Sequence, residues 1–571
     1  MDSWIETLCA GLSMDAIKAS IYDAARALSA DAAARQQRYR DMGWWPGEPL
    51  LARYLRLSAQ RPDALAIADS RGRQLTHYQL LAAADDYARA LARSGVTAGD
   101  VVLMALPNRV EWQVMLLAIF RLAAIPATIP MRTDASNFLH VVELIGARLF
   151  VVPEDGEAKG LDDIAAEVAR HCSHALDIIS VSASGELRHR PASGGATPTR
   201  PGQRALDHIC FTSSTTGRPK AVMHSFDTLA ALNGTFGQRF SLGPDTPIFM
   251  ASPLGHSVGA YHGARLSLFN AAPLILQERW DPDAALAMVQ EYGCAFTAAA
   301  TPFLTDLVNA APPRNGHKLH TLRWFLCGGA QVPPALMDRA AEEFPETRVT
   351  VLWGMTEGGL TTCQADSPKE KFRSTCGTGL PGLELHTVDR EGNTLAPETE
   401  GELVMRGPGI FFGYLGQDDL YRSLLTKDEF FRTGDLAIID AEGYVRVIGR
   451  VKDMIIRGGV NISPVPIEDA LAAHPNVASV AVIGAPDARM GERLCAVIEP
   501  RGRRPDLSEL QQFIRERGLP KYLAPEMLRF VNTMPRTPAG KIRKIDLRPL
   551  VESAAQADAS AQALGTEGRF Q

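Results

Sequence analysis

The sequence predicts an α/β protein with a large N-terminal domain of two βα-layered subdomains and a β-rich module, followed by a small, mobile α+β C-terminal domain. Two alternations of helical stretches with short apolar runs predict the layers. The first extends from Leu51 to about Pro153, and the second from Pro247 to about Val388. From Gly401 the chain becomes rich in strand-like runs, and a smaller α/β region follows after residue 450.

The expected division of the 571 residues is an N-terminal extension (1–50), a large domain (51–450) and a small domain (451–571). A chain of this length is too long for one core. We interpret Trp44 and Trp45 of the extension as an apolar anchor rather than a binding platform, because large aromatic side chains mainly serve burial. Residues 186–206 are rich in Arg, Pro, Gly and Ser and are interpreted as a surface connection.

The composition is that of an ordinary globular protein, with 46% hydrophobic and 22% charged residues. The formal net charge of −6 gives no general attraction to nucleic acid or to anionic membranes. The most apolar window, Val114 to Phe120, ends at Arg121 and is too short to span a bilayer, and the N-terminus lacks the pattern of a signal peptide. We therefore expect a cytoplasmic protein without a membrane span or a nucleic-acid partner.

The cysteines are scattered without a C-x-x-C pair. This argues against a zinc site or a disulfide framework and fits a reducing cytosol. The eight are Cys9, Cys172, Cys210, Cys294, Cys327, Cys363, Cys376 and Cys495.

A hydroxyl-rich loop follows an apolar run in HICFTSSTTGRPKAV, from His208 to Val222. Successive backbone N–H groups in such a loop form an anion-binding concavity, Gly217 allows a sharp turn, and Lys220 adds a positive charge. The expected ligand is a polyphosphate; a plain solvated turn is the alternative, and the Walker A spacing is absent. The candidate phosphate-binding residues are Thr212, Ser213, Ser214, Thr215, Thr216, Gly217 and Lys220.

The pattern T-S-x-T-T-G-x-P-K-A-V resembles the phosphate loop of the adenylate-forming superfamily. That superfamily includes acyl-CoA synthetases, luciferase-like enzymes and peptide-synthetase adenylation domains. Ser214 stands where the family usually has Gly, a departure that affects the flexibility of the loop or its approach to the phosphates. Four further motifs stand in the family's order, two more segments resemble its adenine-edge and acid-pocket regions, and the resemblance covers roughly residues 50–550.

The second segment is Trp353-Gly354-Met355-Thr356-Glu357, after the apolar run VTVLW. A hydroxyl and a carboxylate at a strand end suit Mg²⁺ and a phosphate, since hard cations prefer oxygen ligands; an ordinary strand exit is the alternative. The segment resembles the family's aromatic-G-x-T-E motif. The resemblance implies that Thr356 contacts phosphate, that Glu357 binds Mg²⁺, and that Trp353 and Gly354 lie on the adenine side.

Upstream, Cys327-Gly328-Gly329-Ala330 resembles the family's adenine-edge and acyl-pocket segment. Two glycines permit close approach of the backbone to a flat ligand. The resemblance implies that Gly329 and Ala330 border the nucleotide and that Gly328 borders the acid.

The third segment, Thr433-Gly434-Asp435, precedes Arg450 in GRVKD by fifteen residues. A carboxylate can accept hydrogen bonds from both ribose hydroxyls, whereas an Asp in a turn often serves turn chemistry alone. The resemblance gives Asp435 the ribose, makes Arg450 a ribose or phosphate partner, and places Lys452 at the hinge between the two domains.

Two segments of the small domain complete the resemblance. Gly458 and Gly459 fall where the family lines a pantetheine tunnel, with a turn between strands as an equal alternative. Lys541 lies in PRTPAGKIRK, a basic loop that is by itself typical of a solvated face. The resemblance implies that Lys541 contacts the attacking carboxylate and the α-phosphate, where an ammonium stabilises charge that develops in the transition state.

Pro253 to Gly259 (PLGHSVG) resembles a wall of the acid pocket, with His256 closing over the acid; a satisfied core histidine is the alternative. No Asp is present there to hold an α-amino group, and the apolar, glycine-rich lining favours an aromatic, alicyclic or medium-chain acid. The candidate pocket residues are Asn233, Phe236, His256, Gly328, Leu352, Gly354, Gly359 and Leu360.

The resemblance implies ATP-dependent conversion of a carboxylic acid to an acyl-adenylate, followed by transfer to coenzyme A, with ATP, Mg²⁺ and coenzyme A required. One alternative is a stand-alone adenylating enzyme that loads a carrier-protein phosphopantetheine or another nucleophile. A second is a silent adenylate-binding protein. Residues 377–382 (GTGLPG) satisfy the dinucleotide pattern G-x-G-x-x-G, but a strand-like run follows where the fingerprint needs a helix, so we expect a turn.

Overall fold

The computed structural model describes residues 30–154, 160–192, 194, 206–212, 218–310, 319–329, 332–536, 542–553 and 555. These residues form two compact units. The described residues of 1–214, 218–384 and 406–425 make up the large unit, and those of 385–405 and 426–571 make up the small unit. The α/β fold class expected from the sequence is confirmed.

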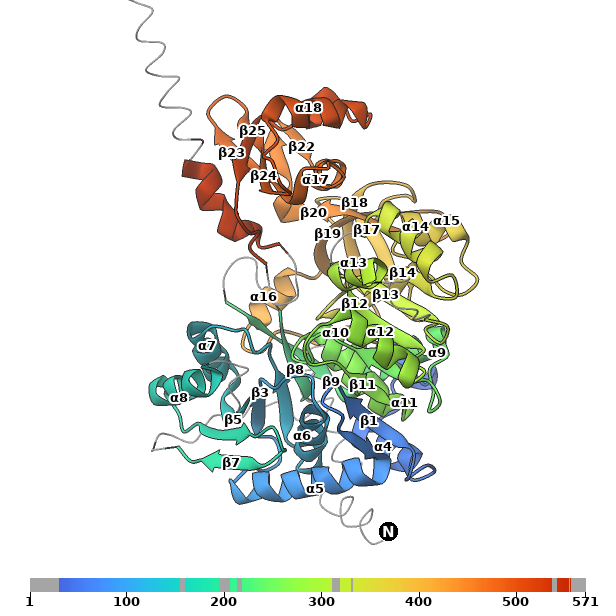
Figure 1. The fold of residues 1–571 in the computed structure, drawn as a ribbon, viewed down its shortest axis with the longest axis vertical. Helices are drawn as coiled ribbons and strands as arrows, with labels where there is room; N and C mark the ends of the chain where they lie inside the picture. Colours follow the sequence, from blue (N-terminus) through green and yellow to red (C-terminus); the bar gives the residue numbers. More distant parts are fainter. Residues whose placement is uncertain are drawn as a thin grey trace, which may run out of the picture. The chain divides into compact units, whose positions relative to one another are not determined.

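One sheet of the large unit has seven strands (Figure 1). In spatial order they are β7 (Leu187–Arg190), β6 (Asp177–Val181), β5 (Ala147–Pro153), β3 (Val101–Met104), β4 (Ile125–Thr128), β8 (Leu206–Thr212) and β9 (Lys220–Ser225). The five inner strands run parallel, and the edge strands β7 and β9 are antiparallel to their neighbours. All four residues of β3 are buried, as expected of a parallel strand covered on both faces. Strand β7 lies within the surface connection expected over 186–206, and two of its four residues are exposed.

The second sheet of the large unit has nine strands. In spatial order they are β16 (Thr378–Gly379), β15 (Gly358–Thr362), β14 (Arg348–Met355), β13 (Trp324–Gly328), β12 (Phe296–Ala300), β10 (Ile248–Met250), β11 (Leu274–Leu276), β1 (Leu65–Asp69) and β2 (Gln74–Thr76). Strands β14 to β1 of this order run parallel, while β15, β16 and β2 are antiparallel additions at the edges.

The helices of the large unit connect these strands. Capping groups mark several starts: Thr76 and Gln79 form a capping box at α5, and Asp134 caps α7. The helices are α3 (Ala30–Asp41), α4 (Leu50–Ser58), α5 (His77–Arg93), α6 (Val110–Arg121), α7 (Ala135–Ile145), α8 (Leu161–His171), α9 (Phe226–Phe240), α10 (Ser257–Gly259), the π-helix η2 (Ala260–Arg265), α11 (Leu266–Asn270), α12 (Pro282–Glu291), α13 (Thr301–Ala310), α14 (Pro334–Glu343), α15 (Lys369–Ser374) and α16 (Asp418–Ser423).

Helix α6 joins the two sheets. It contacts α5, β1 of the nine-stranded sheet and β4 of the seven-stranded sheet. Its residues from Trp112 to Ile119 are all buried. The most apolar window of the sequence is therefore a core helix, and within the described ranges no helix is long and apolar enough to cross a membrane.

Trp45 and Gly47 attach the N-terminal extension to the rest of the large unit. The indole N–H of Trp45 donates to the carbonyl of Pro408 over 2.9 Å, and the ring of Trp45 lies edge-on to Tyr39 with centroids 5.4 Å apart. The backbone N–H of Gly47 donates to the carboxylate of Asp227 over 2.9 Å. These contacts agree with an anchor rather than an open binding platform.

In the small unit, the first sheet consists of β17 (Glu384–Val388), β18 (Gly401–Arg406), β19 (Phe431–Ile439) and β20 (Val445–Arg450), so the β-rich stretch expected from Gly401 is confirmed. A second sheet contains β22 (Val460–Ile462), β21 (Ile455–Arg457), β24 (Gly491–Pro500), β23 (Val477–Asp487) and β25 (Met527–Phe530). Its helices are α17 (Val465–Ala472) and α18 (Leu507–Glu516), with short 3₁₀ turns η3 (Val451–Asp453) and η4 (Lys521–Leu523).

Among the histidines buried in the described part of the large unit are His77, His208, His224 and His262. Burial lowers the pKa of each imidazole, to about 4 for His77 and His224 and to about 3 for His262. Nearby positive charge adds to the effect, since Arg265 lowers the pKa of both His208 and His224. These rings are therefore neutral near pH 7.

The buried histidines predict a loss of stability on acidification. Between pH 6.5 and about 4 the unfolded chain binds protons that the folded chain does not, so the free energy of unfolding falls as the pH falls through this window. For His224 alone the full effect is about 3 kcal/mol. We expect the thermal midpoint of His224→Gln to fall less steeply with acid than that of the unmodified protein, whereas the same change at exposed His171 leaves the slope unaltered. Equal slopes for all three proteins would contradict this account.

The segment 377–382 contains the short strand β16 and then the expected turn, at Pro381 and Gly382, and it does not form a dinucleotide fingerprint. Gly377 has φ +75° and precedes β16, and β17 follows where the fingerprint needs a helix. A Cβ on Gly377 overlaps the backbone of Thr362 and Cys363. Only glycine fits between these strands.

We expect Gly377→Ala to destabilise the protein by more than about 3 kcal/mol, because both backbone strain and overlap with the neighbouring strand oppose it. Gly72→Ala is the matched control: Gly72 has φ +84° in the turn between β1 and β2, but a Cβ there meets nothing within 4 Å. It should cost only about 1–2 kcal/mol. Urea unfolding of both variants measures the difference in their free energies of unfolding. Similar losses of stability in both would show that the overlap at residue 377 does not destabilise the protein.

Candidate functional site

The predicted phosphate loop lies between the inner strand β8 and the edge strand β9, which pair as a hairpin. Strand β8 ends at Thr212, β9 begins at Lys220, and these two residues face each other in register. The ammonium of Lys220 lies 4.9 Å from the centroid of the Tyr414 ring. Ser213, Ser214, Thr215, Thr216 and Gly217 lie outside the described residues. The hairpin thus places the two ends of the loop, Thr212 and Lys220, side by side.

The Trp353–Glu357 segment forms a second hairpin. Strand β14 ends at Met355 and β15 begins at Gly358, with a register shift at Gly354 and Met355, so Thr356 and Glu357 occupy the turn. The strand end expected from the sequence is therefore a reversal of the chain. Although they lie in a turn, Thr356 and Glu357 are only 7% and 5% exposed. A buried carboxylate needs hydrogen-bond partners.

Tyr414 supplies that partner. Its hydroxyl donates to Oε1 of Glu357 over 2.6 Å. Burial, and next the charge of Glu357, raises the pKa of Tyr414, so the phenol keeps its proton and remains a donor. Tyr414 also forms an isolated backbone bridge with Val222 of β9. It therefore links the strand that follows the phosphate loop to the buried carboxylate.

Thr356 is held by two other segments. His224 of β9 has Nε2 2.9 Å from the Thr356 carbonyl and Nδ1 3.1 Å from the hydroxyl of Thr228. Because a carbonyl only accepts, Nε2 of the neutral ring carries the hydrogen. The hydroxyl of Thr356 donates to Oγ of Ser257 over 3.2 Å. The backbone N–H of Phe411 donates to the carbonyl of Glu357 over 2.8 Å.

His256 precedes Ser257 and caps a short, irregular helix. The N–H of Val258 donates to its Nδ1 over 3.4 Å, and the imidazole is half-buried. Helix α10 passes directly into the π-helix η2, and such insertions occur frequently at functional sites. The Ser257–Thr356 contact joins the predicted acid-pocket wall to the Thr356–Glu357 turn.

Several predicted pocket residues adjoin one another on the nine-stranded sheet. Gly328 faces Leu352 across β13 and β14, and Gly354 faces Leu360 across β14 and β15. A Cβ on Gly328 lies 2.7 Å from the Leu352 carbonyl oxygen, so this glycine is also required by strand packing.

The other predicted residues of this region differ in burial. Trp353, Gly359 and Leu360 are buried in the β14–β15 hairpin, and Gly329 is exposed at the end of β13 with φ +86°. Ala330 lies outside the described residues.

Asn233 and Phe236 project from α9 toward the π-helix. The amide of Asn233 donates to the carbonyl of Tyr261 over 2.8 Å, and Phe236 stacks on His262 with ring centroids 4.9 Å apart. Both residues are buried. Phe236 also contacts the ring of Phe296 on β12 of the nine-stranded sheet, with centroids 5.6 Å apart.

In the small unit, Asp435 and Arg450 are cross-strand partners on β19 and β20. Nε of Arg450 lies 2.9 Å from Oδ1 of Asp435; the arginine side chain is 42% exposed and the aspartate side chain 7%. The sequence predicted separate contacts of these residues with a nucleotide, and the structure pairs them with each other. Lys452 follows in the 3₁₀ turn η3.

Gly458 and Gly459 form the two-residue turn of the β21–β22 hairpin, with φ +58° and +81°. Positive φ at both positions is typical of a tight hairpin turn and favours glycine. The turn interpretation is therefore correct for the backbone. Lys541 lies outside the described residues; the flanking Arg536 and Ile542 form an isolated backbone bridge, and Lys544 pairs with Glu468 over 2.8 Å.

Sequence reasoning missed Tyr414, Ser257 and His224. Tyr414 lies in GIFFGYLG, where a tyrosine between glycines at the end of an apolar run is the available signal. His224 lies two residues beyond the fifteen-residue stretch that we singled out, inside a buried strand. The partner of Tyr414, Glu357, lies 57 residues away along the chain, and the partner of His224, Thr356, lies 132 residues away.

Comparisons with known proteins agree with this architecture. Residues 55–415 match the AMP-binding enzyme family, and residues 466–541 match the AMP-binding enzyme C-terminal domain. The medium-chain fatty-acid–CoA ligase of Escherichia coli K12 is 31% identical over 530 residues, covering 90% of this chain and 92% of that protein. The salicyl-AMP ligase/salicyl-S-ArCP synthetase of Mycobacterium tuberculosis is 30% identical over 523 residues, covering 89% and 92%.

Among solved structures, ATP-bound MatB from Rhodopseudomonas palustris is similar with a TM-score of 0.77 and 26% identity, covering 89% of this chain and 99% of that one. Both the large and the small family domain are therefore present in one chain, in the family's order. The protein belongs to the AMP-binding, adenylate-forming enzyme family.

Proposed function

We propose that the protein activates a carboxylic acid with ATP and transfers the acyl group to coenzyme A. In the first step a carboxylate oxygen attacks the α-phosphorus of ATP, giving acyl-adenylate and pyrophosphate; in the second, a thiol sulfur attacks the acyl carbon and AMP leaves. The observation that carries the proposal is the Thr356–Glu357 turn, held by Tyr414 beside the strand that begins at Lys220. Chemistry of this kind depends mainly on positioning and on charge stabilisation.

The residues of the large unit suit a triphosphate and a hard cation. In our proposal Thr212, Lys220 and Thr356 bind phosphate oxygens, and Glu357 binds Mg²⁺. The fit rests on Glu357: its buried carboxylate accepts a hydrogen bond from the neutral phenol of Tyr414 on Oε1, and carboxylate oxygens are ligands that Mg²⁺ prefers. Bound Mg²⁺ neutralises charge on the triphosphate. Trp353 and Gly354, with Gly329 and Ala330, border the adenine.

Five residues from 213 to 217 complete the proposed phosphate loop: Ser213, Ser214, Thr215, Thr216 and Gly217. In the small unit we assign the ribose to Asp435, a ribose or phosphate contact to Arg450, and the hinge to Lys452. Gly458 and Gly459 leave space for pantetheine, and Lys541 neutralises charge at the α-phosphate. The proposed domains are 1–50, 51–450 and 451–571.

For the acid, an uncharged aromatic, alicyclic or medium-chain group fits best. The proposed lining of Phe236, Leu352 and Leu360 is buried and apolar, and burying a second charge there requires a partner. His256 closes over the carboxylate. Asn233, Gly328 and Gly359 complete the proposed pocket.

A second candidate acceptor is the phosphopantetheine of a carrier protein. It is favoured by the likeness to the mycobacterial salicyl-AMP ligase/salicyl-S-ArCP synthetase. Both acceptors present the same thiol, so a pantetheine channel at Gly458 and Gly459 serves either.

The function is tested by measuring AMP and thioester formation with ATP, Mg²⁺ and one acid at a time: benzoate, cyclohexanecarboxylate, cinnamate, hexanoate, octanoate and decanoate. Hydroxylamine traps any adenylate regardless of the acceptor. We expect trapped adenylate with at least one acid, and thioester with coenzyme A. Thioester on holo-carrier protein alone would select the second candidate. No adenylate with any acid would contradict acid activation.

We expect Lys541→Ala to lower ATP–pyrophosphate exchange by roughly a hundred-fold or more while ATP still binds, because the charge that develops at the α-phosphate loses its partner. Lys544→Ala is the matched control, since Lys544 pairs with Glu468 and supports the fold. It should lower stability and leave exchange per folded molecule near that of the unmodified protein. Equal exchange by both variants would remove Lys541 from the site.

Tyr414 is proposed as a positioning residue. Tyr414→Phe removes the hydrogen bond to Glu357, and a bond to a charged group contributes about 1.5–3 kcal/mol, so exchange should fall roughly ten- to hundred-fold. The Mg²⁺ concentration for half-maximal exchange should rise. Tyr87→Phe removes a comparable 2.7 Å bond, to the Gly185 carbonyl, and serves as control. If both variants respond alike to Mg²⁺, Tyr414 acts only through stability.

A further inference from the structure

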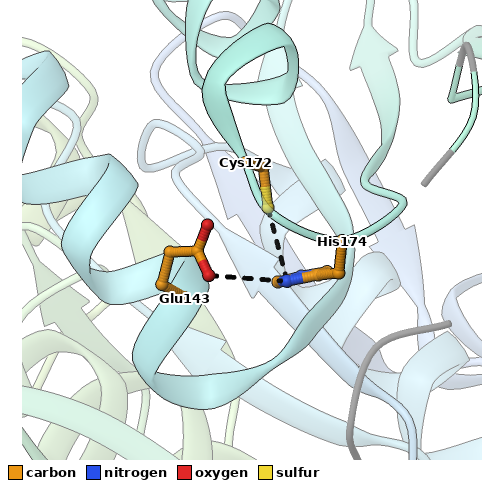
Figure 2. A group of neighbouring side chains, drawn as sticks. All are labelled: Glu143, Cys172 and His174. Atoms are coloured by element: carbon orange, nitrogen blue, oxygen red, sulfur yellow. Dashed lines mark hydrogen bonds and ion pairs between the residues drawn. The ribbon is translucent and has the colours of Figure 1, made fainter. Parts of the chain in front are cut away.

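Glu143, Cys172 and His174 form a cluster of three potential metal ligands (Figure 2). Glu143 belongs to the last turn of α7, Cys172 follows the end of α8, and His174 lies in the connection from α8 to β6. One ligand atom from each residue lies within 4.8 Å of the other two. These residues have no part in the proposed reaction.

The histidine is oriented as in many metal sites. Its Nε2 lies 2.9 Å from the carbonyl oxygen of Ala147, the first residue of β5. Because that oxygen only accepts, Nε2 carries the hydrogen and Nδ1 presents its lone pair to the cluster. A backbone carbonyl that fixes the far nitrogen of a histidine is a common outer partner of a metal-bound imidazole.

Nδ1 faces both other donor atoms, as Figure 2 shows. It lies 3.4 Å from Sγ of Cys172 and 3.9 Å from Oε2 of Glu143. A hydrogen bond from the Cys172 thiol to Nδ1 accounts for the 3.4 Å distance without a metal. The 3.9 Å distance places the Glu143 carboxylate near the lone pair of Nδ1, and a cation between these two groups stabilises that arrangement.

The carboxylate is itself held in place. The backbone N–H and the hydroxyl of Ser173 each donate to Glu143 over 2.6 Å. Ser173 lies between Cys172 and His174 in the chain. The short segment 172–174 therefore supplies two of the metal ligands, and its middle residue orients the third ligand, Glu143. Such outer hydrogen bonds restrict the direction in which a ligand carboxylate points.

The distances suit a tetrahedral ion. With zinc–ligand bonds of about 2.0–2.3 Å, neighbouring nitrogen and sulfur ligands lie roughly 3.5 Å apart, and nitrogen and oxygen ligands roughly 3.3 Å. The observed 3.4 Å between Nδ1 of His174 and Sγ of Cys172 already matches the nitrogen–sulfur separation. The nitrogen–oxygen separation, 3.9 Å, is longer, and metal binding requires Oε2 of Glu143, whose side chain is 35% exposed, to move closer to Nδ1.

We propose that Glu143, Cys172 and His174 bind a borderline divalent transition metal such as Zn²⁺, with the fourth position filled by water. Thiolate and imidazole select such ions over Mg²⁺ and Ca²⁺, which prefer oxygen alone. On binding, the ion takes the place of the Cys172 thiol proton, which passes to solvent. The bound ion fastens the ends of α7 and α8 to the start of β5.

The test uses the full chain and Co²⁺ as a spectroscopic probe. We expect one equivalent of Co²⁺ to give a thiolate-to-cobalt charge-transfer band with the intense visible bands of a tetrahedral ion. Zn²⁺ should displace it, and a large excess of Mg²⁺ should not. Zn²⁺ should also raise the thermal midpoint of the unmodified protein.

Cys172→Ser should abolish the charge-transfer band, His174→Gln should weaken Co²⁺ binding at least ten-fold, and Glu143→Gln should weaken it less. The matched controls are Cys376→Ser, at the other half-buried cysteine of the described chain, and His171→Gln, at an exposed histidine nearby. Near-ultraviolet circular dichroism verifies that each variant is folded. The proposal is overturned if the band is absent, if it survives in Cys172→Ser, or if it is lost equally in Cys376→Ser.

Discussion

The buried carboxylate of Glu357 is the constraint on which the arrangement of the large unit depends. At 5% exposure the carboxylate has lost most of its water, and the Tyr414 hydroxyl replaces part of it over 2.6 Å. Satisfying this group requires the segment around residue 414 to return to β9. The backbone bridge between Tyr414 and Val222 provides that return.

Neutral donors surround the turn. Tyr414 keeps its proton because its pKa is raised, and His224 is uncharged near pH 7 because burial lowers its pKa to about 4. A cationic partner at these positions would cancel the charge of Glu357, whereas a phenol and a neutral imidazole hold the turn without doing so. The positive charge of Lys220 lies instead over the face of Tyr414. In our account the buried carboxylate of Glu357 attracts a metal ion.

Much of the fold followed from local sequence. The alternation predicted from Leu51 to about Pro153 contains strands β3 and β5 and helix α5, because neighbouring residues determine both burial and helix capping. The hairpin at 212–220 and the turn at 458–459 were also predictable, since glycine and hydroxyl residues mark chain reversals. The family resemblance supplied the order of the motifs and hence the candidate residues.

What remained hidden depends on contacts between distant segments. The pairing of Asp435 with Arg450 follows from the register of β19 and β20, which fifteen residues of spacing do not specify. The approach of Glu143 to Cys172 and His174 depends on how α7 and α8 pack, and it lacks the close cysteine spacing that signals a zinc site in a sequence. Gly328 and Gly354 carried a functional interpretation, yet strand packing also requires glycine at residue 328.

The most direct measurement of the central claim is a crystal structure of the protein with ATP and Mn²⁺, in which anomalous scattering locates the metal. The account predicts a manganese peak within coordination distance of the Glu357 carboxylate, with Tyr414 still donating to its Oε1. A manganese ion bound to the triphosphate but remote from Glu357, with that carboxylate bonded to Tyr414 alone, would contradict it.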